Sequence, residues 1–230
     1  MNEPRQPSRH ALLVVLALGS LWGLSEVALN PALRLAPDLP RSGILVGVGA
    51  LCLGMALGYG GRARLLPLAV LVPILLKQLA FPLRGMAPVC DANACLAVGL
   101  EGLALTGAAV VAAGGQRGRG AALRLGAAAG AAIVLAATAF ALLGPRLAPC
   151  PYLLSFGTSA GGVARFLTHE GLIWGAAAAV TFPLGAHLGA LAGQRAAALA
   201  ARYRPAMALA GTAVVAAAWL AAAWTIAAIR

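Results

Sequence analysis

Long apolar stretches, separated by short gaps rich in Pro, Gly and Arg, recur along nearly the whole chain. Each stretch has roughly 18 or more residues, which is enough for a helix to cross a hydrocarbon core about 30 Å thick. A segment that crosses a bilayer on its own must be helical, because lipid offers no hydrogen-bond partner for its backbone N–H and C=O groups. The pattern predicts an all-α, polytopic transmembrane helix bundle of about seven spans, or six if the last stretch does not cross. The predicted spans are Ala11–Asn30, Ser42–Gly60, Leu65–Leu83, Ala94–Ala113, Ala121–Leu143, Glu170–Gly193 and Ala206–Ile229.

The composition supports a single integral-membrane domain over residues 1–230. Of the 230 residues, 61% are hydrophobic and 10% are charged, whereas soluble domains are about 45–50% apolar and about 25% charged. Too little polar chain remains for a separate soluble domain. Residues 1–10 are polar and are interpreted as a cytoplasmic tail. The apolar run that follows continues to about Leu33, which is long for a signal peptide and favours a retained first span.

The strong positive charge, formally +11, would indicate nucleic acid in a soluble protein. Here the arginines lie in the gaps between apolar runs, and aromatic residues make up only 5% of the chain, so no nucleic-acid partner is predicted. With the N-terminus in the cytoplasm, ten arginines fall inside and six outside, while Asp38, Asp91 and Glu170 fall outside. The positive-inside rule therefore predicts a multi-pass protein of a bacterial inner (plasma) membrane, with a cytoplasmic N-terminus and an external C-terminus.

Four predicted helices place ionisable side chains in the outer half of the membrane. Ionisable groups within a span are costly and are functional candidates by default. Lys77, the single lysine, needs a carboxylate partner, and either Glu26 or Glu101 could provide it. The candidate substrate-binding residues are Trp22, Glu26, Lys77, Gln78, Glu101, His169 and Glu170.

Two interpretations of these residues remain open. In the functional one, they line a polar cavity that opens outward and binds a small polar or charged solute. In the structural one, a buried Lys–Glu pair fixes the register of the helices, and Glu170 lies in the headgroup region. We favour the functional interpretation, because clustered intramembrane charges commonly mark a solute or proton path.

Three cysteines are predicted to lie on the outer side. Cys90 and Cys95 precede the fourth span, Cys150 lies in the long outer loop, and Cys52 lies within the second span. The spacing predicts one disulfide or free thiols and leaves open whether Cys90 pairs with Cys95 or with Cys150. Metal or redox chemistry is the alternative. It is disfavoured because the spacing is not CxxC and no His accompanies the pair, so no metal and no cofactor is predicted.

Small residues and one long gap complete the pattern. Gly43, Gly47, Gly54 and Gly58 lie on one face of the second predicted span, and the first span carries Gly19 and Gly23 at the same spacing of four. Such faces let helix backbones approach closely, either within the chain or against a partner subunit. The gap of residues 144–169 is predicted to be a long outer loop that acts as a lid.

The layout resembles the substrate-binding S components of energy-coupling factor transporters, together with related uncharacterised bacterial membrane proteins. The residues that carry the resemblance are the segments Trp22–Glu26 and Glu101–Leu103, the small pair Gly19 and Gly23, and the cysteine-bearing outer loops. The resemblance implies that Gly19 and Gly23 dock on a transmembrane coupling subunit whose ATPases supply the energy. The cobalt and nickel binders of that group begin with a His-rich N-terminus, which this chain lacks.

We therefore expect a substrate-binding or transport subunit for a small polar solute. The alternatives are a membrane thiol-redox or metal-handling protein that uses the outer cysteines, and a membrane enzyme that acts on lipid-linked substrates. No catalytic residue is predicted, because no hydrolase motif is visible in the sequence.

Overall fold

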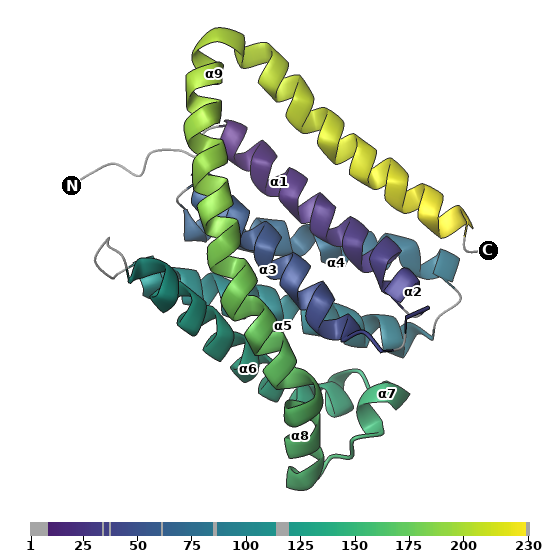
Figure 1. Ribbon diagram of the computed structural model, residues 1–230. Coiled ribbons are helices and arrows are strands. Elements are labelled where there is room, and N and C mark those ends of the chain that lie inside the picture. The colour runs from purple at the N-terminus through teal and green to yellow at the C-terminus, as the bar shows by residue number, and fades with distance from the viewer. Residues whose placement is uncertain are drawn as a thin grey trace.

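The computed structural model describes residues 9–33, 35–36, 38–60, 62–84, 87–113 and 120–228, and it forms an all-α bundle (Figure 1). The side chains of residues 9–10, 80–84, 113, 197, 199–208 and 226 are outside the description. The elements are α1 (Arg9–Leu24), η1 (Ser25–Leu29), α2 (Asn30–Leu33), α3 (Arg41–Gly60), η2 (Ala63–Leu65), α4 (Leu66–Arg84), α5 (Pro88–Ala113), α6 (Ala121–Leu147), α7 (Pro151–Leu154), α8 (Ala160–Phe166), η3 (Leu167–Gly171) and α9 (Leu172–Ala228).

Within the described residues, five helical segments are long and apolar enough to cross a membrane. They are Ala11–Leu33, Arg41–Gly60, Pro88–Ala112, Ala121–Leu147 and Ala160–Ala196. The last predicted span corresponds to a shorter apolar segment, Leu209–Thr225. The third predicted span corresponds to α4, a 19-residue helix whose side chains are described only as far as Leu79. These findings confirm a helical, multi-pass membrane protein, while the count of seven stays a prediction.

The long helix α9 turns back on the bundle. Figure 1 shows α9 rising past α3, bending sharply near its middle and descending along α1. The descending arm is fixed to α1 by a hydrogen bond in which Trp219 Nε1 donates to Ser20 Oγ at 3.1 Å. Lower down, Ala222 packs with Val27 and Leu76 in a small apolar cluster. The final apolar stretch is therefore part of the helical bundle.

Glycine faces hold α3 directly against α9. A Cβ added at Gly54 or Gly58 would overlap the backbone of Phe182 or Ala186 in α9. In the reverse direction, a Cβ at Gly189 would overlap the backbone of Met55 in α3. Gly54 and Gly58 are thus used for packing within the chain, which is one of the two interpretations that the sequence left open for this face.

Gly19 and Gly23 also pack within the chain. Both are buried, and they face α4, where added Cβ atoms would meet Ala69 and Leu76 respectively. In this arrangement α4 occupies the face that was expected to dock on a partner subunit. The docking role of these two glycines on a partner subunit stays a prediction.

Two turns of π-helix interrupt the α-helical ladder, and each carries a predicted site residue. Glu26 lies in η1, and His169 and Glu170 lie in η3. Pro31 lies two residues after the end of η1 and has no N–H to bond the carbonyl of Val27, four residues earlier, which favours an irregular turn there. Turns of this kind are rare and are often found at functional sites.

Residues 144–169 are largely helical, so the prediction of one long outer loop over this whole range is wrong. Helix α6 continues through Pro145 to Leu147, and α7 and α8 follow after short connections. Helix α8 begins at Ser159, whose side chain accepts a hydrogen bond from the N–H of Gly162, as an N-cap residue does. The sixth predicted span therefore begins about ten residues earlier than expected, because α8, η3 and α9 form one continuous helix.

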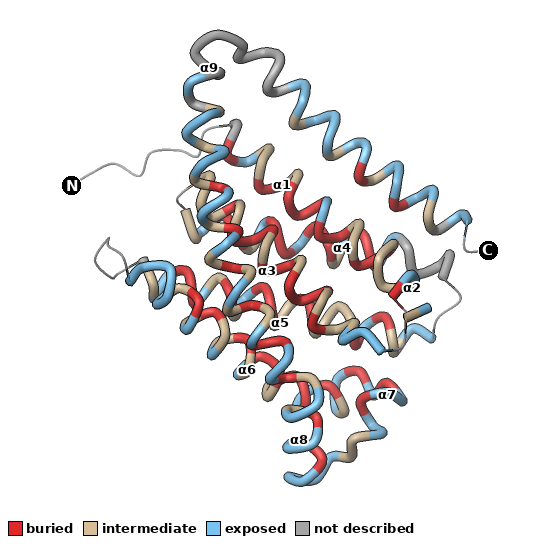
Figure 2. Tube along the Cα trace, viewed as in Figure 1, coloured by how far each residue is buried: buried red, intermediate tan, exposed pale blue. Residues whose placement is uncertain are grey.

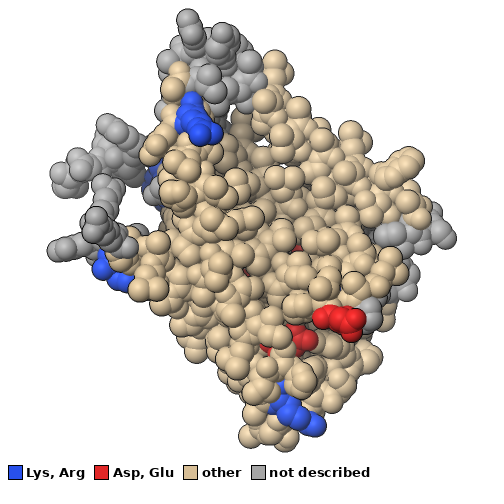
Figure 3. Space-filling view, viewed as in Figure 1, with Lys and Arg blue, Asp and Glu red and all other residues tan. Residues whose placement is uncertain are grey.

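Charged side chains separate toward two ends of the bundle. We call the end that carries Asp38, Asp91 and Glu170 the acidic end; there α1 and α2 finish and α3 begins. Arg62, Arg64, Arg124 and Arg195 lie toward the opposite end, which we call the basic end, although the acidic end also holds Arg41, Arg146 and Arg165. Figure 3 shows the acidic side chains gathered on the lower part of the molecule. Figure 2 shows the buried positions along the helices that face one another, with exposed apolar positions outside them, as expected in lipid.

Candidate functional site

A buried ion pair joins α4 to the π-turn that follows α1. Lys77 Nζ lies 2.7 Å from Glu26 Oε2, and the two side chains are 3% and 5% exposed. The sequence left Glu26 and Glu101 as possible partners for Lys77, and the structure pairs Lys77 with Glu26. Removing either partner would leave an uncompensated charge in the interior.

A cavity of about 140 Å³ opens beside this ion pair, and we call it the inner chamber. Glu101 of α5 lines the inner chamber together with Glu26, Lys77 and Asn30. Glu101 is only 6% exposed, and no described residue is recorded as its hydrogen-bond or ion-pair partner. Three helices thus place two carboxylates and one ammonium group around one small space.

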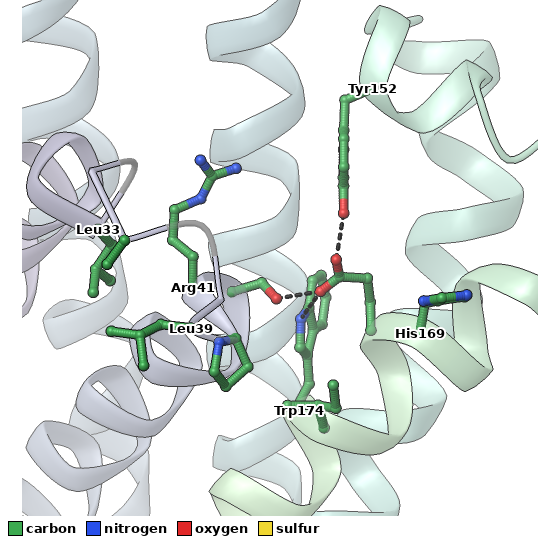
Figure 4. Close-up of a pocket in the computed structure, with 11 residues that line it drawn as sticks. Leu33, Leu39, Arg41, Tyr152, His169 and Trp174 are labelled. Atoms are coloured by element: carbon green, nitrogen blue, oxygen red, sulfur yellow. Dashed lines mark hydrogen bonds between the residues drawn. The ribbon is translucent and has the colours of Figure 1, made fainter.

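A second cavity, of about 410 Å³, lies at the acidic end and is called the outer chamber. Glu170 is at its centre and accepts three hydrogen bonds (Figure 4). Its donors are the hydroxyl groups of Ser42 and Tyr152 and the indole Nε1 of Trp174, the last at 3.2 Å. Because these donors come from α3, α7 and α9, they fix the carboxylate in one orientation across three elements.

The two chambers adjoin one another. Arg41, Ser42 and Trp174 line both of them. Figure 4 shows Arg41 on the side of the outer chamber opposite Tyr152. A solute could therefore contact Glu170 and Arg41 in the outer chamber while one of its groups reaches Glu101 in the inner chamber.

Two predicted site residues lie outside both chambers. Trp22 is 1% exposed and packs against Gly49 in the interior between α1 and α3. Gln78 is exposed, and its Nε2 donates to Cys95 Sγ at 3.2 Å. Adjacent positions on a helix point in different directions, so Gln78 does not follow Lys77 into the inner chamber.

His169 lines the outer chamber but is exposed, and Figure 4 shows its ring pointing away from the hydrogen bonds around Glu170. The predicted residues that the chambers do bring together are Glu26, Lys77, Glu101 and Glu170.

Sequence reasoning missed four residues of the chambers: Arg41, Ser42, Tyr152 and Trp174. Trp174 could have been predicted from its spacing, because it is four residues after Glu170 and so lies on the same helix face. The other three lie at helix ends or on the short helix α7. Their sequence positions carry no periodicity that points to a common site.

The structure places Cys150, rather than Cys95, beside Cys90. Cys150 Sγ lies 2.9 Å from Cys90 Sγ, whereas Cys95 contacts Gln78 and is 4.0 Å from Asp91 Oδ2. All three are free thiols here. Within the described part of the chain, no group of three or more His, Cys, Asp or Glu side chains is arranged to hold a metal ion.

Tyr152 is the residue of the outer chamber whose protonation is most affected by its surroundings. Burial of part of its ring raises the pKa of the phenol, and the hydrogen bond to Glu170 and the negative charge of that group raise it further. Arg41 acts in the opposite direction. The phenol therefore stays protonated and remains a donor to Glu170 throughout the physiological range.

The fold and the chambers define the class of this protein: it is a multi-pass, all-helical membrane protein with a polar interior at one end. Comparisons with protein-family models, with curated proteins and with solved structures gave no match.

Proposed function

We propose that the chain is a substrate-binding or transport subunit that takes a small polar solute from the acidic end of the bundle. The observation that carries the proposal is the convergence of Glu26, Lys77, Glu101 and Glu170, from four different helical segments, on two adjoining cavities. Intramembrane ionisable residues are rare and commonly mark solute or ion pathways.

The sizes of the chambers are compatible with a small molecule. The outer chamber lies within the usual range of ligand pockets, roughly 300–1,000 Å³. The inner chamber is similar in volume to an engineered cavity of about 150 Å³ that takes a benzene molecule. The outer chamber would then hold the body of the solute, and the inner chamber one of its functional groups.

The positive-inside rule supports a finer topology for this proposal. The basic end would face the cytoplasm, and the acidic end with both chambers would face outward. Seven spans, with the N-terminus inside and the C-terminus outside, follow from counting α4 and the descending arm of α9 as crossings. The resemblance to energy-coupling factor S components adds a transmembrane coupling subunit and ATPases as proposed partners.

Filling the inner chamber tests the site. Ala94 of α5 lines the inner chamber, and Ala92, two residues away, is exposed. Purified protein in detergent would be screened against small polar solutes by thermal unfolding, because a ligand that binds the folded state raises its stability. A solute that stabilises the wild-type protein and Ala92→Leu but not Ala94→Leu would support the site. A solute that stabilises all three equally would place binding elsewhere.

Isolation from the native membrane tests the partners. Mild-detergent purification of tagged protein, followed by mass spectrometry, is expected to recover a second membrane subunit with a pair of ATPases. Recovery of the chain alone, or with thiol oxidoreductases, would contradict the energy-coupled assembly and favour the thiol-redox alternative.

A further inference from the structure

The charges around the two chambers do not balance. Three carboxylates, those of Glu26, Glu101 and Glu170, face two cationic groups, those of Lys77 and Arg41. Lys77 is engaged by Glu26 at 2.7 Å. Glu170 is satisfied by three hydrogen-bond donors and lines the outer chamber together with Arg41.

Glu101 is the carboxylate that remains without a partner of its own. It is buried in the middle of α5, it lines the inner chamber, and no described residue is recorded as donating a hydrogen bond to it. A buried carboxylate without a donor or counter-ion is costly, so the empty chamber favours the protonated form of Glu101 and a bound cation favours the ionised form. Here the space in front of it is a cavity rather than a side chain.

From this geometry we infer that the inner chamber receives a cationic group of the solute, namely a protonated amine, and that Glu101 is its counter-ion. The inference rests on the proposed function and specifies the class of the solute. An ammonium group donates hydrogen bonds and carries the one positive charge that the chambers lack. Trp174, which lines both chambers, adds an aromatic ring of the kind that attracts cations.

The arrangement disfavours an anion in the inner chamber. An anionic group there would lie between the carboxylates of Glu26 and Glu101, and the ammonium of Lys77 is already held by Glu26. Like charges at short range in a poorly solvated site are strongly unfavourable. A neutral group would form no charge-assisted hydrogen bond with Glu101.

The test uses three four-carbon probes of matched size and different charge: butylammonium, n-butanol and butyrate. Thermal unfolding of the purified full chain, as a function of probe concentration, gives an apparent Kd. Butylammonium is expected to bind the wild-type protein. In Glu101→Gln its affinity is expected to fall by about tenfold or more, because a charge-assisted hydrogen bond is lost.

Two variants make the result specific. Glu101→Gln keeps the size of the side chain and removes an unpaired charge, so the protein is expected to remain folded and to gain stability. Glu101→Asp keeps the charge and is expected to restore much of the binding. Equal binding of butylammonium to wild type and Glu101→Gln would overturn the role of Glu101.

Failure of this inference is distinguishable from failure of the proposed function. If butyrate or butanol binds better than butylammonium, and Ala94→Leu blocks that binding, the chambers bind a solute but the cationic class is wrong. If butylammonium binds Ala94→Leu as well as the wild-type protein, its site lies outside the inner chamber and this assignment also fails.

An independent observation concerns the cover of the outer chamber. Cys150 directly precedes α7, and Tyr152 in that helix donates to Glu170. The same connection is already tied to α5, because Asn93 Nδ2 donates to the carbonyl of Ala148 at 2.9 Å. The thiols of Cys90 and Cys150, 2.9 Å apart, form a second point of contact between α5 and this segment.

The geometry points to a disulfide between Cys90 and Cys150 that fastens α7 over the outer chamber. It would form by exchange with the disulfide of a dithiol oxidant. The two thiols lose two protons and two electrons as the S–S bond forms, and the oxidant is reduced to its dithiol. Such a bond requires that the acidic end face an oxidising compartment.

Thiol counting tests the bond. Membranes would be dissolved in sodium dodecyl sulfate that contains N-ethylmaleimide, so that buried thiols also react, and the cysteine-containing peptides mapped with and without reduction. The expected result is a linked pair of Cys90 and Cys150, alkylated Cys52 and Cys95, and an unchanged pair in Cys95→Ser. A Cys90–Cys95 link, or alkylation of all four thiols without reduction, would overturn the proposal.

Discussion

The contact between α3 and α9 differs between its two ends. Toward the basic end, the two helices meet backbone to backbone, and a Cβ at Gly58 or Gly189 would overlap the opposite main chain. Toward the acidic end, the nearest atom to a Cβ at Gly47 is 3.6 Å away, and a Cβ at Gly43 would overlap the side chain of Ile173 rather than a main chain. The outer chamber lies at this end, where backbone contact gives way to side-chain contact, and it is lined by Ser42 of α3 and Trp174 of α9.

The difference teaches how one bundle combines rigidity with a polar interior. Close small-residue packing gains dispersion contacts and needs no polar partner. Polar side chains need space and donors, which the bundle provides where the helices separate and where π-turns redirect Glu26 and Glu170. We therefore expect substitutions at the basic end to act on folding, and substitutions at the acidic end to act on the site.

The largest expected effect comes from breaking the glycine contact. Gly58→Leu would force α3 away from the backbone of α9. Because a backbone cannot move aside as a side chain can, we expect a cost well above the ~1–3 kcal/mol of ordinary overpacking, and above that of breaking the buried ion pair. We expect little folded protein, measured as the monodisperse fraction in size-exclusion chromatography.

Gly107 of α5 is the matched control for that substitution. A Cβ there meets nothing within 4 Å, so Gly107→Leu should leave folding intact. If both variants behave alike, close contact at Gly58 is not what holds the two helices together.

The next largest effect is expected at the buried ion pair. Lys77→Met leaves the carboxylate of Glu26 without its partner, and breaking a buried pair typically costs about 3–5 kcal/mol. The double variant Glu26→Gln/Lys77→Met removes both charges and should recover most of the thermal stability. An additive loss in the double variant, measured by thermal unfolding, would mean that the two groups are not coupled.

A smaller effect is expected at the cover of the outer chamber. Tyr152→Phe removes one donor to Glu170, worth about 1 kcal/mol for a partly exposed group. The raised pKa also predicts a pH dependence. The stabilisation from the protonated phenol is complete below the ordinary tyrosine pKa of about 10, and it is lost as the pH rises toward the folded-state value.

The wild-type protein should therefore lose more stability above pH 10 than Tyr152→Phe does, as measured by chemical denaturation across the alkaline range. Parallel alkaline losses in the two proteins would show that the phenol is not held in its protonated form by Glu170.

The smallest effect is expected where the descending arm of α9 meets α1. Ser20→Ala removes the acceptor of Trp219 Nε1, and hydrogen bonds between membrane helices average about 0.6 kcal/mol. A slight decrease in the midpoint of thermal unfolding would support the packing of this arm on α1. A loss as large as that of Lys77→Met would show that this contact is as important as the ion pair.

Much of the fold could be predicted from the hydrophobic pattern. The starts or ends of α3, α5 and α6 lie at or close to the predicted span limits. The length of an apolar run, and the Pro or Gly residues that bound it, can be read from the local sequence alone. The extension of the sixth span to Ala160 could not be read in the same way. The segment before Glu170 is short, glycine-rich and polar, yet it forms a helix because its aromatic side chains pack: the rings of Phe156, Phe166 and Trp174 contact one another.

The sequence by itself determined that this chain is a helical membrane protein. It also showed a few ionisable residues within the predicted spans, where the cost of burying a charge makes them functional candidates. Only the tertiary structure decided that Lys77 pairs with Glu26 and that Cys90 meets Cys150. It also placed Trp22 in the interior rather than in the site. The physical reason is that helical periodicity specifies which residues share a face, whereas the partner of that face depends on how the helices pack in three dimensions.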